Sequence, residues 1–344
     1  MISWSDFIAL WTHRYHKYTH IAGKYLSFAK KYLRLRRLKA RLGNRMLVGI
    51  MLSEQFGDII ACEPVAREVR ILHPDAYIIW FVRKPYVELV ANHPDLDGYI
   101  VEKCPGEREQ ILRSGILDKV YNLHLSHRKC KYCFEDPINP IADQLDITYA
   151  NYFHKGNLLS VFSKAAGLPP LDDTPRLYLP NPVFGKIDSL QLPQPYIVIN
   201  CQSSHVPKDW SPVNWNRLTR WLLDNYPYAV VEVGLKPVVN LSHPRFFNLC
   251  GQLQILETAE VIRRSHLFIG IDSGPAHLAN AAGTEGIILL GQLFDFVDYM
   301  PYSGRYKRGE GITIINNLGH PCADLPYEWV QEAVELRLSQ VKQV

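Results

Sequence analysis

The sequence predicts an α/β protein with two Rossmann-like, doubly wound domains that face a cleft, preceded by a basic amphipathic helical arm. Three observations predict this fold. Strand-like and helix-like segments alternate from residue 46, the alternation stops in a proline-rich stretch and restarts, and cations and aromatic rings are concentrated at the amino terminus. The predicted parts are the arm (1–45), a first domain (46–170), a linker (171–195), a second domain (196–325) and a carboxyl-terminal helix (326–344).

The arm holds eleven lysines and arginines against a single acid, Asp6, and interleaves them with tryptophan, tyrosine and phenylalanine. Its apolar runs are too short to span a bilayer and no signal-peptide cleavage site follows. An amphipathic helix on an anionic membrane surface fits best, because rings settle among headgroups while cations meet lipid phosphates. A helix packed on its own domain is the alternative. Nucleic acid is disfavoured, because the chain's net charge of +4 leaves about −6 outside the arm.

In the first domain, residues 46–52, 76–82 and 118–125 read as buried strands and residues 58–72 as a helix. Residues 167–195 are rich in proline and show no helical period, which is typical of a linker. In the second domain the alternation restarts. Its predicted strands are 196–201, 229–234, 267–271 and 286–291, and its predicted helices are 212–225, 256–265, 275–283 and roughly 326–342. Seven cysteines without a secretory signal indicate a reducing compartment.

The stretch FIGIDSGPAHLANAAG carries the first candidate site. Asp272 ends a predicted strand, Gly274 lets the backbone approach a ligand, and His277 lies in the first turn of a helix, where free N–H groups favour an anion. This arrangement suits a diphosphate or a sugar diphosphate. The alternative is structural, with Ser273 capping the helix and Asp272 pairing with His277.

A second cluster follows the first strand of the same domain, in INCQSSHVPKDW. The hydroxyls of Ser203 and Ser204 and the cation of Lys208 can hold phosphate oxygens. The spacing of an ATP-binding P-loop is absent, and no G-x-G-x-x-G follows a predicted strand, which disfavours an ATPase and a nicotinamide enzyme.

A third cluster lies in the first domain, where Gly57 permits a turn after the first strand and Asp58 opens the next helix. A carboxylate there could accept a proton from an incoming hydroxyl. Plain helix capping by Asp58 is the alternative.

Taken in this order, the three clusters resemble glycosyltransferase family 9, the ADP-heptose:lipopolysaccharide heptosyltransferases, which have a GT-B fold. The resemblance covers roughly residues 46–342. The matching residues are Gly57, Asp58 and Pro64; Ser203, Ser204, Lys208 and Trp210; and Asp272, Ser273, Gly274, His277 and Ala279 to Gly283.

The resemblance implies an inverting transfer of heptose from a nucleotide-diphosphate sugar, ADP-heptose, to a hydroxyl of a lipopolysaccharide-type or other glycan acceptor. It implies that Asp58 is the catalytic base, that Gly57 lies on the acceptor side, and that no metal or other cofactor is required. The enzyme would be cytoplasmic, peripheral on the inner face of the inner membrane. The donor would be held by Ser203, Ser204, Lys208, Asp272, Ser273, Gly274 and His277, with Leu253 against the base. The sequence departs from the family after residue 234, where LKPVVNLSHP offers Lys236 but no acid for the ribose.

One further group lies in HLSHRKCKYC, where His124, His127, Cys130 and Cys133 are spaced by three. Cys130 and Cys133 are weak candidates for a zinc or iron site, because four ligands within one short run are atypical. Partly buried cysteines with surface histidines are the alternative. His124 and His127 are candidates for the acceptor side, since they follow a strand's carboxyl end.

Two other functions remain open for this fold. A sugar-nucleotide epimerase or hydrolase would act on the donor without an acceptor. A catalytically silent, membrane-associated binding protein would keep the phosphate site and tolerate loss of Asp58.

Overall fold

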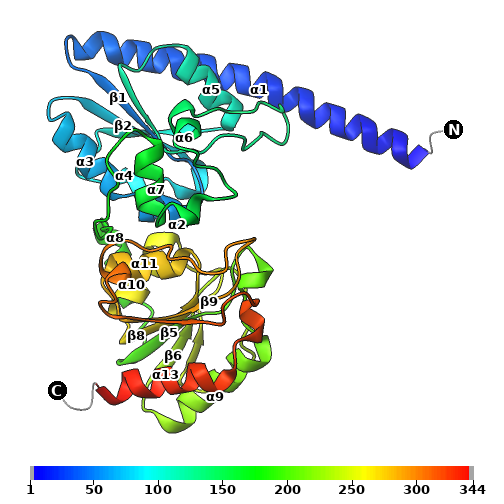
Figure 1. Ribbon diagram of the computed structural model, residues 1–344, viewed down its shortest axis with the longest axis vertical. Coiled ribbons are helices and arrows are strands. Elements are labelled where there is room, and N and C mark those ends of the chain that lie inside the picture. The colour runs from blue at the N-terminus through cyan, green and yellow to red at the C-terminus, as the bar shows by residue number, and fades with distance from the viewer. Residues whose placement is uncertain (1–3, 341–344) are drawn as a thin grey trace. The chain divides into compact units, whose positions relative to one another are not determined.

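The computed structural model describes residues 4–340, which form two compact units (Figure 1). Within the described residues, the first contains 4–54, 66–149 and 162–169, and the second contains 55–65, 150–161 and 170–340. Residues 55–65 and 150–161 thus group with the second unit, although the sequence boundaries place them in the first domain. Asp58 and the residues around it therefore belong to the same unit as the D-S-G-x-x-H motif.

The first unit is built on a parallel sheet of four strands in the order β3-β2-β1-β4. Its central strand LVGIM is wholly buried, as expected for a parallel sheet covered on both faces. The strands are β1 (Leu47–Met51), β2 (Tyr77–Arg83), β3 (Gly98–Glu102) and β4 (Lys119–Asn122).

Short helices connect these strands. The sequence predicts one helix over 58–72, but the structure has two, because Pro64 has no N–H to continue the first helix and starts the second. The helices before residue 170 are α2 (Phe56–Ala61), α3 (Pro64–Leu72), α4 (Glu88–Ala91), α5 (Pro105–Arg113), α6 (Pro140–Gln144) and α7 (Leu158–Ala165).

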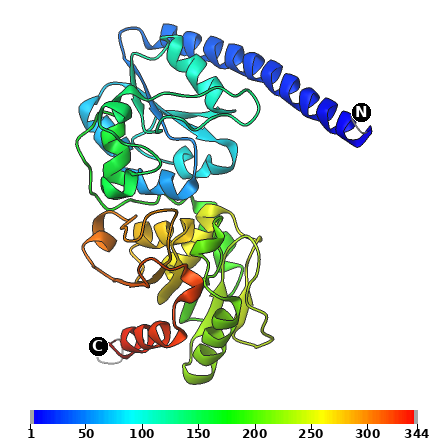
Figure 2. The same cartoon turned by 45° about the vertical axis from the view of Figure 1, so that its right-hand side comes forward.

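The arm is a single helix, α1 (Trp4–Leu42), whose two halves differ. Its carboxyl-terminal half packs on the sheet of the first unit through Leu35, which is wholly buried, and through Phe28 and Tyr32. Its amino-terminal half extends away from the rest of this unit (Figure 2). No helix within residues 4–340 has an apolar stretch long enough to cross a membrane.

The second unit is a six-stranded parallel sheet in the order β10-β9-β8-β5-β6-β7. In chain order within the unit this is 6-5-4-1-2-3, the doubly wound arrangement of dinucleotide-binding folds. The strands are β5 (Tyr196–Asn200), β6 (Ala229–Glu232), β7 (Phe246–Asn248), β8 (Leu267–Ile271), β9 (Gly286–Leu290) and β10 (Ile312–Asn316).

Local signals define the ends of the helices in this unit. α9 (Pro212–Asn225) has proline in its first turn, α10 (Ile255–Arg264) begins with a capping box, and α11 (Gly274–Ala282) ends at Gly283 with a left-handed φ of 73°. α12 (Gly304–Lys307) and α13 (Tyr327–Gln340) complete the unit. Trp210 and Trp215 are almost completely buried in its core.

The predicted linker contains a helix that the sequence pattern does not predict, α8 (Asn181–Asp188). Val183 and Ile187 are buried on it, and the Asp188 carboxylate pairs with Arg264 on α10 at 2.6 Å. Tertiary contacts stabilise this short helix where its own sequence is a weak helix former.

Candidate functional site

The D-S-G-x-x-H motif lies where the second sheet reverses its strand order, between the carboxyl ends of β5 and β8. Asn200, the last residue of β5, is buried, and its amide donates to the Val233 carbonyl at 2.9 Å. Its side-chain oxygen accepts a hydrogen bond from the Ser273 hydroxyl at 2.7 Å. The Ser273 side chain therefore binds β5 and makes no capping hydrogen bond to α11, so the capping interpretation of this serine is wrong.

Asp272 is a buried carboxylate with three partners. Lys208 Nζ lies 2.7 Å from one oxygen, and the hydroxyls of Tyr299 and Tyr302 donate to the two oxygens at 3.0 and 3.2 Å. Burial alone would raise the pKa of Asp272, but the charges of Lys208 and His277 and the hydrogen bonds from Lys208 and Tyr299 outweigh it and lower the pKa. Asp272 is thus an anion that holds the Lys208 ammonium beside the start of α11.

His277 lies in the first turn of α11 and is 5% exposed. Burial lowers the pKa of His277 to about 4. The charge of Asp272 opposes this shift, and the charge of Lys208 adds to it. The imidazole is therefore neutral at pH 7. Its ring packs against Tyr302 with centroids 4.8 Å apart, and Nδ1 has no hydrogen-bond partner among the described residues. A buried polar atom without a partner is costly unless a ligand or water satisfies it.

Two glycines allow α2 and α11 to approach each other at their amino-terminal ends. A Cβ on Gly274 would overlap the Phe56 ring, and a Cβ on Gly57 would lie 3.1 Å from His277 Cδ2. The absence of a side chain at Gly274 therefore lets the Phe56 ring of the same unit pack against this turn. The sequence predicts a second role for Gly274, the close approach of a ligand, which stays a prediction. Asp58 follows Gly57 at the third position of α2.

Asp58 accepts a hydrogen bond from the Gln55 N–H at 3.3 Å, within a reciprocal capping box at the start of α2. The side chain is partly exposed. The capping interpretation of Asp58 thus describes one of its contacts, and its role as a base stays a prediction.

The loop after β5 places the second cluster beside the first. The Ser203 hydroxyl donates to Asp209 Oδ1 at 2.7 Å and accepts from the His205 N–H, so it fixes the loop's own shape, while Ser204 is exposed. Lys208 ends this loop and reaches Asp272. The structure thus brings Lys208 together with Asp272, Ser273, Gly274 and His277.

Leu253, the predicted base-contacting residue, is half buried just before the capping box of α10. The loop after β6, where Lys236 is exposed, is held by Glu232, the last residue of that strand. The buried Glu232 carboxylate accepts from the N–H groups of Val238 at 2.7 Å and Val239 at 3.3 Å. Burial raises the pKa of Glu232, and these hydrogen bonds oppose the shift.

His124 and His127 lie in the first unit and differ from each other. His124 is buried, and its Nε2 accepts from the Ser53 N–H at 3.1 Å. His127 has a left-handed φ of 65°, and its largely exposed side chain lies 3.3 Å from Asp136. Neither histidine joins the four potential metal ligands that the structure gathers around Cys130 and Cys133, so the equal spacing in the sequence does not reflect a shared site.

The sequence motifs missed several residues of this site: Asn200, Tyr299, Tyr302 and Phe56. Asn200 could have been found, because it is a polar residue at the carboxyl end of a predicted strand. The tyrosines lie in an irregular segment after β9, so no periodicity marks them.

Comparison with known proteins places this geometry in a family context. The model of glycosyltransferase family 9 (heptosyltransferase) matches residues 157–306. The solved family 9 glycosyl transferase from Veillonella parvula is 17% identical, with a TM-score of 0.64 over 86% of this chain and 97% of that one. The ADP-heptose lps heptosyltransferase II of E. coli is 18% identical, with a TM-score of 0.63 over 86% of this chain and all of that one.

A third structure is that of the dodecameric iron-containing heptosyltransferase TibC from enterotoxigenic E. coli, in complex with ADP-D-β-D-heptose. It is 18% identical, with a TM-score of 0.53 over 81% of this chain and 64% of that one. No curated protein matches the chain. The resemblance to glycosyltransferase family 9 is confirmed over residues 157–306, and the chain is a glycosyltransferase with the two-domain GT-B fold of the heptosyltransferases.

Proposed function

We propose that this glycosyltransferase transfers heptose from ADP-heptose to a hydroxyl of a lipopolysaccharide-type acceptor, with inversion at the anomeric carbon. One observation carries the proposal. Lys208, the neutral His277 and the start of α11 converge in the second unit, directly beside the turn of α2 that bears Asp58. The names of two similar structures, which mention ADP-heptose, support this choice of donor.

The donor diphosphate would bind at the start of α11. The first-turn N–H groups of that helix and the Lys208 ammonium, 2.7 Å from Asp272, would stabilise charge as it develops on the departing ADP. His277 Nδ1 would gain the hydrogen-bond partner that it lacks among the described residues. Ser203 and Ser204 would lie beside the phosphates. Asp272 and Ser273 would lie beside the sugar, and Leu253 would contact the adenine.

Asp58 would act as the base. The acceptor hydroxyl gives its proton to the carboxylate while its oxygen bonds to the anomeric carbon, and the bond from that carbon to the phosphate oxygen breaks on the opposite face. Gly57 would border the acceptor beside His277. The proposed reaction needs no metal, because Lys208 and α11 balance the charge of the leaving group.

The test is Asp58→Asn, which keeps the size of the side chain and removes its basicity. We expect kcat to fall by about 10³, with ADP-heptose affinity within about twofold of the wild type. Lys208→Met should weaken ADP binding about tenfold or more. Loss of donor binding in Asp58→Asn would contradict the assigned role. Tighter binding of a UDP, GDP or CDP sugar than of ADP-heptose would contradict the proposed donor. Release of free heptose in the absence of an acceptor would indicate a hydrolase.

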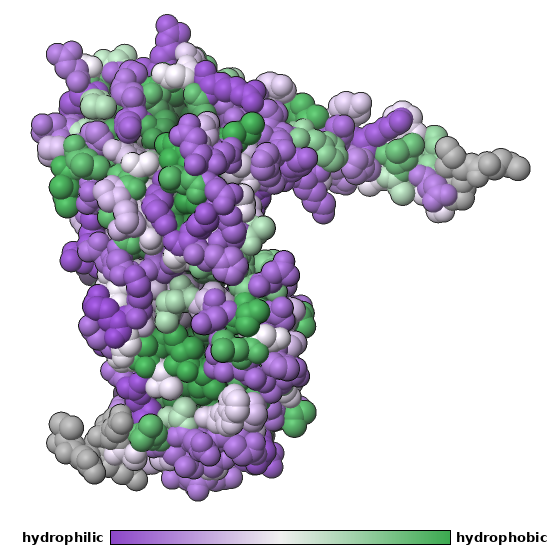
Figure 3. All heavy atoms as spheres, in the orientation of Figure 1, coloured by the Kyte–Doolittle hydropathy of each residue, from purple (hydrophilic) through white to green (hydrophobic). Residues whose placement is uncertain are grey.

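The amino-terminal half of α1 would hold the enzyme on the inner face of the inner membrane, from the cytoplasmic side. Trp4, Phe7, Trp11, Tyr15 and Tyr18 follow each other at helical spacing, and each exposes 44% or more of its surface. Figure 3 shows apolar and polar residues mixed along this part of the helix. Exposed rings beside lysine and arginine suit the headgroup region of an anionic membrane.

Sedimentation with vesicles containing phosphatidylglycerol tests this proposal. Trp4→Ser combined with Trp11→Ser should reduce binding at least fivefold, whereas Trp329→Ser, at an exposed tryptophan of α13, should not. Substitution is preferable to removing the arm, because Leu35 belongs to the core of the first unit. Equal sedimentation of the wild type, the double variant and Trp329→Ser would contradict the membrane proposal.

A further inference from the structure

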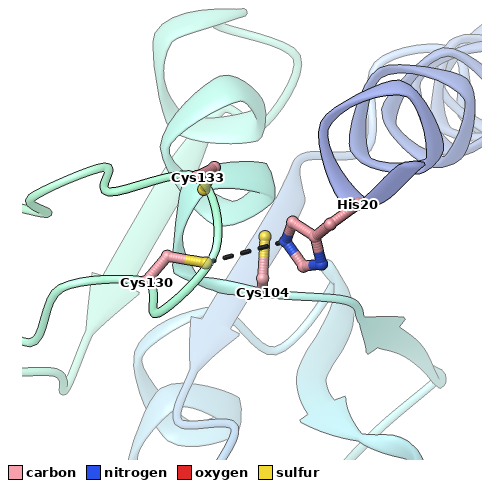
Figure 4. A group of neighbouring side chains, drawn as sticks. All are labelled: His20, Cys104, Cys130 and Cys133. Atoms are coloured by element: carbon pink, nitrogen blue, oxygen red, sulfur yellow. Dashed lines mark hydrogen bonds between the residues drawn. The ribbon is translucent and has the colours of Figure 1, made fainter. Parts of the chain in front are cut away.

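Four potential metal ligands meet in the first unit, from segments far apart in the sequence: His20, Cys104, Cys130 and Cys133 (Figure 4). Their ligand atoms all lie within 4.8 Å of one another, and Cys130 Sγ is 3.6 Å from His20 Nε2. In a tetrahedral zinc site with Zn–S bonds of about 2.3 Å, neighbouring sulfur atoms are about 3.8 Å apart. The four side chains therefore need little movement to enclose one ion.

The two cysteines of the C-x-x-C segment lie on a tight turn. The Phe134 N–H donates to the Cys130 carbonyl and the Cys130 N–H donates to the Glu135 carbonyl, both at 3.0 Å. Phe134 has a left-handed φ of 56°, which closes the turn. Backbone turns of this kind present two thiolates to one side, as zinc knuckles require.

Cys104 supplies the third sulfur from a different element. It lies between β3 and α5 and is the residue that precedes the first turn of α5. Two residues later, Gly106 leaves room for the knuckle, since a Cβ there would lie 2.7 Å from Cys133 Sγ. The start of α5 is thus shaped to receive the cysteine turn.

The fourth ligand, His20, comes from α1. Its ring packs on Tyr132, which lies between the two knuckle cysteines, with centroids 5.0 Å apart. Its Nε2 atom lies 3.6 Å from Cys130 Sγ, and an imidazole nitrogen beside thiolates is a usual zinc ligand.

The charge around the cluster suits three thiolates on a divalent ion, which together carry −1. Lys24, one turn beyond His20, is only 4% exposed and lies 3.6 Å from Glu135. Its side chain also approaches Gly106 beside Cys133. A buried lysine next to an acid and a thiolate site can offset the extra negative charge.

We propose that His20, Cys104, Cys130 and Cys133 form a structural zinc site that fixes α1 to the first unit. Zinc is the ion that three thiolates and one imidazole in a closed tetrahedral set prefer. The bound ion would join α1, the start of α5 and the cysteine turn near the point where the exposed half of α1 begins. It would set the direction of the exposed aromatic face and take no part in the transfer reaction.

The first experiment measures the metal content of the full chain purified after growth with added zinc. We expect about one zinc per chain, falling below about 0.1 in His20→Ala and Cys133→Ser. Two matched controls should keep their zinc: His16→Ala, at an exposed histidine of α1, and Cys250→Ser, at a partly buried cysteine of the second unit. His20→Cys should restore the ion, because a fourth thiolate also completes a zinc site. Recovery of zinc in His20→Cys would show that residue 20 binds the ion and does not only pack against the cluster.

A second readout is the digestion of α1 by trypsin. Chelation of zinc from the wild type should accelerate cleavage near His20 about tenfold, while His20→Ala should already be cleaved rapidly and respond little. Substitution with cobalt should give the thiolate charge-transfer and tetrahedral ligand-field bands, which Cys133→Ser should alter.

Four outcomes would overturn the assignment. The proposal would be contradicted if the wild type contained no metal. It would also be contradicted if His20→Ala contained as much zinc as the wild type. A Cys130–Cys133 disulfide in metal-free protein would replace it with a redox pair. One iron per chain, lost in the same variants, would keep the four ligands and overturn zinc.

Discussion

Each unit has a point where its parallel sheet reverses strand order, and the two points use similar polar groups with different access to solvent. In the first unit, Ser53 follows β1 and contacts Glu102 at the end of β3 and His124 just after β4, and Arg108 pairs with Glu102 at 3.2 Å. The side chains of Arg108 and Glu102 are only 1% and 2% exposed. This charged group is closed to water and to any large ligand.

In the second unit the equivalent group is partly exposed to solvent. Lys208 pairs with Asp272 at 2.7 Å, but its side chain is 15% exposed, against 4% for the aspartate. His277 beside it keeps Nδ1 without a partner among the described residues. The same sheet geometry thus supports a sealed ion pair in one unit and an accessible cation in the other. The difference predicts that substitutions in the first group affect mainly stability, whereas those in the second affect donor binding as well.

The largest stability loss is expected for Glu102→Gln. The substitution leaves the buried Arg108 charge without its paired carboxylate, which costs about 3–5 kcal/mol, because the guanidinium cannot reach water. Denaturant unfolding measures the loss, and calorimetric titration with ADP should show an affinity within about twofold of the wild type. A large loss of ADP affinity at unchanged stability would contradict the contrast between the two units.

Asp272→Asn should cost less stability, about 2–3 kcal/mol, because Lys208 can turn toward solvent. It should weaken ADP-heptose binding by at least tenfold, since Lys208 and the two tyrosines lose the anion that positions them. Titration calorimetry on the folded variant measures this. Retained affinity would indicate that the accessible lysine, without its partner, is sufficient for the donor.

The pH dependence of stability tests the buried histidine. Because burial lowers the pKa of His277 to about 4, against about 6.5 in the unfolded chain, its contribution is present above pH 6.5 and declines as pH falls toward 4. Between pH 7.5 and 5.5 the loss is about 1.4 kcal/mol. His277→Asn should flatten the stability curve by that amount. Parallel curves for variant and wild type would contradict the assigned protonation.

Much of this fold could be predicted, because its strands are continuous buried runs and its helices have clear ends. The sequence predicts β8 and α9 with their observed bounds, and the D-S-G-x-x-H motif locates the switch point of the second sheet. It misses β3 and β10, which are only partly buried, and the three-residue β7.

Contacts between distant segments could not be predicted. Periodicity places His124, His127, Cys130 and Cys133 together, whereas the fold brings the two cysteines to Cys104 and to His20, which lies 110 residues before Cys130. Local spacing reports which side chains share a segment, and tertiary packing decides which segments meet. Phe56 against Gly274 illustrates the same limit, because each residue is unremarkable in its own motif.

The smallest expected effect compares one serine from each group. Ser273→Ala leaves the buried Asn200 oxygen without its 2.7 Å hydrogen bond and should cost about 1 kcal/mol or slightly more. Ser53→Ala removes a 3.2 Å hydrogen bond to Glu102, which still has Arg108, so its cost should be about 0.5 kcal/mol. Thermal unfolding of the two variants, with Ser204→Ala at an exposed position as the control, gives the order directly. If Ser53→Ala were the more destabilising, this order would be contradicted. The buried group around Glu102 and Arg108 would then depend on every hydrogen bond in it, whereas the group around Asn200 would tolerate the loss of one.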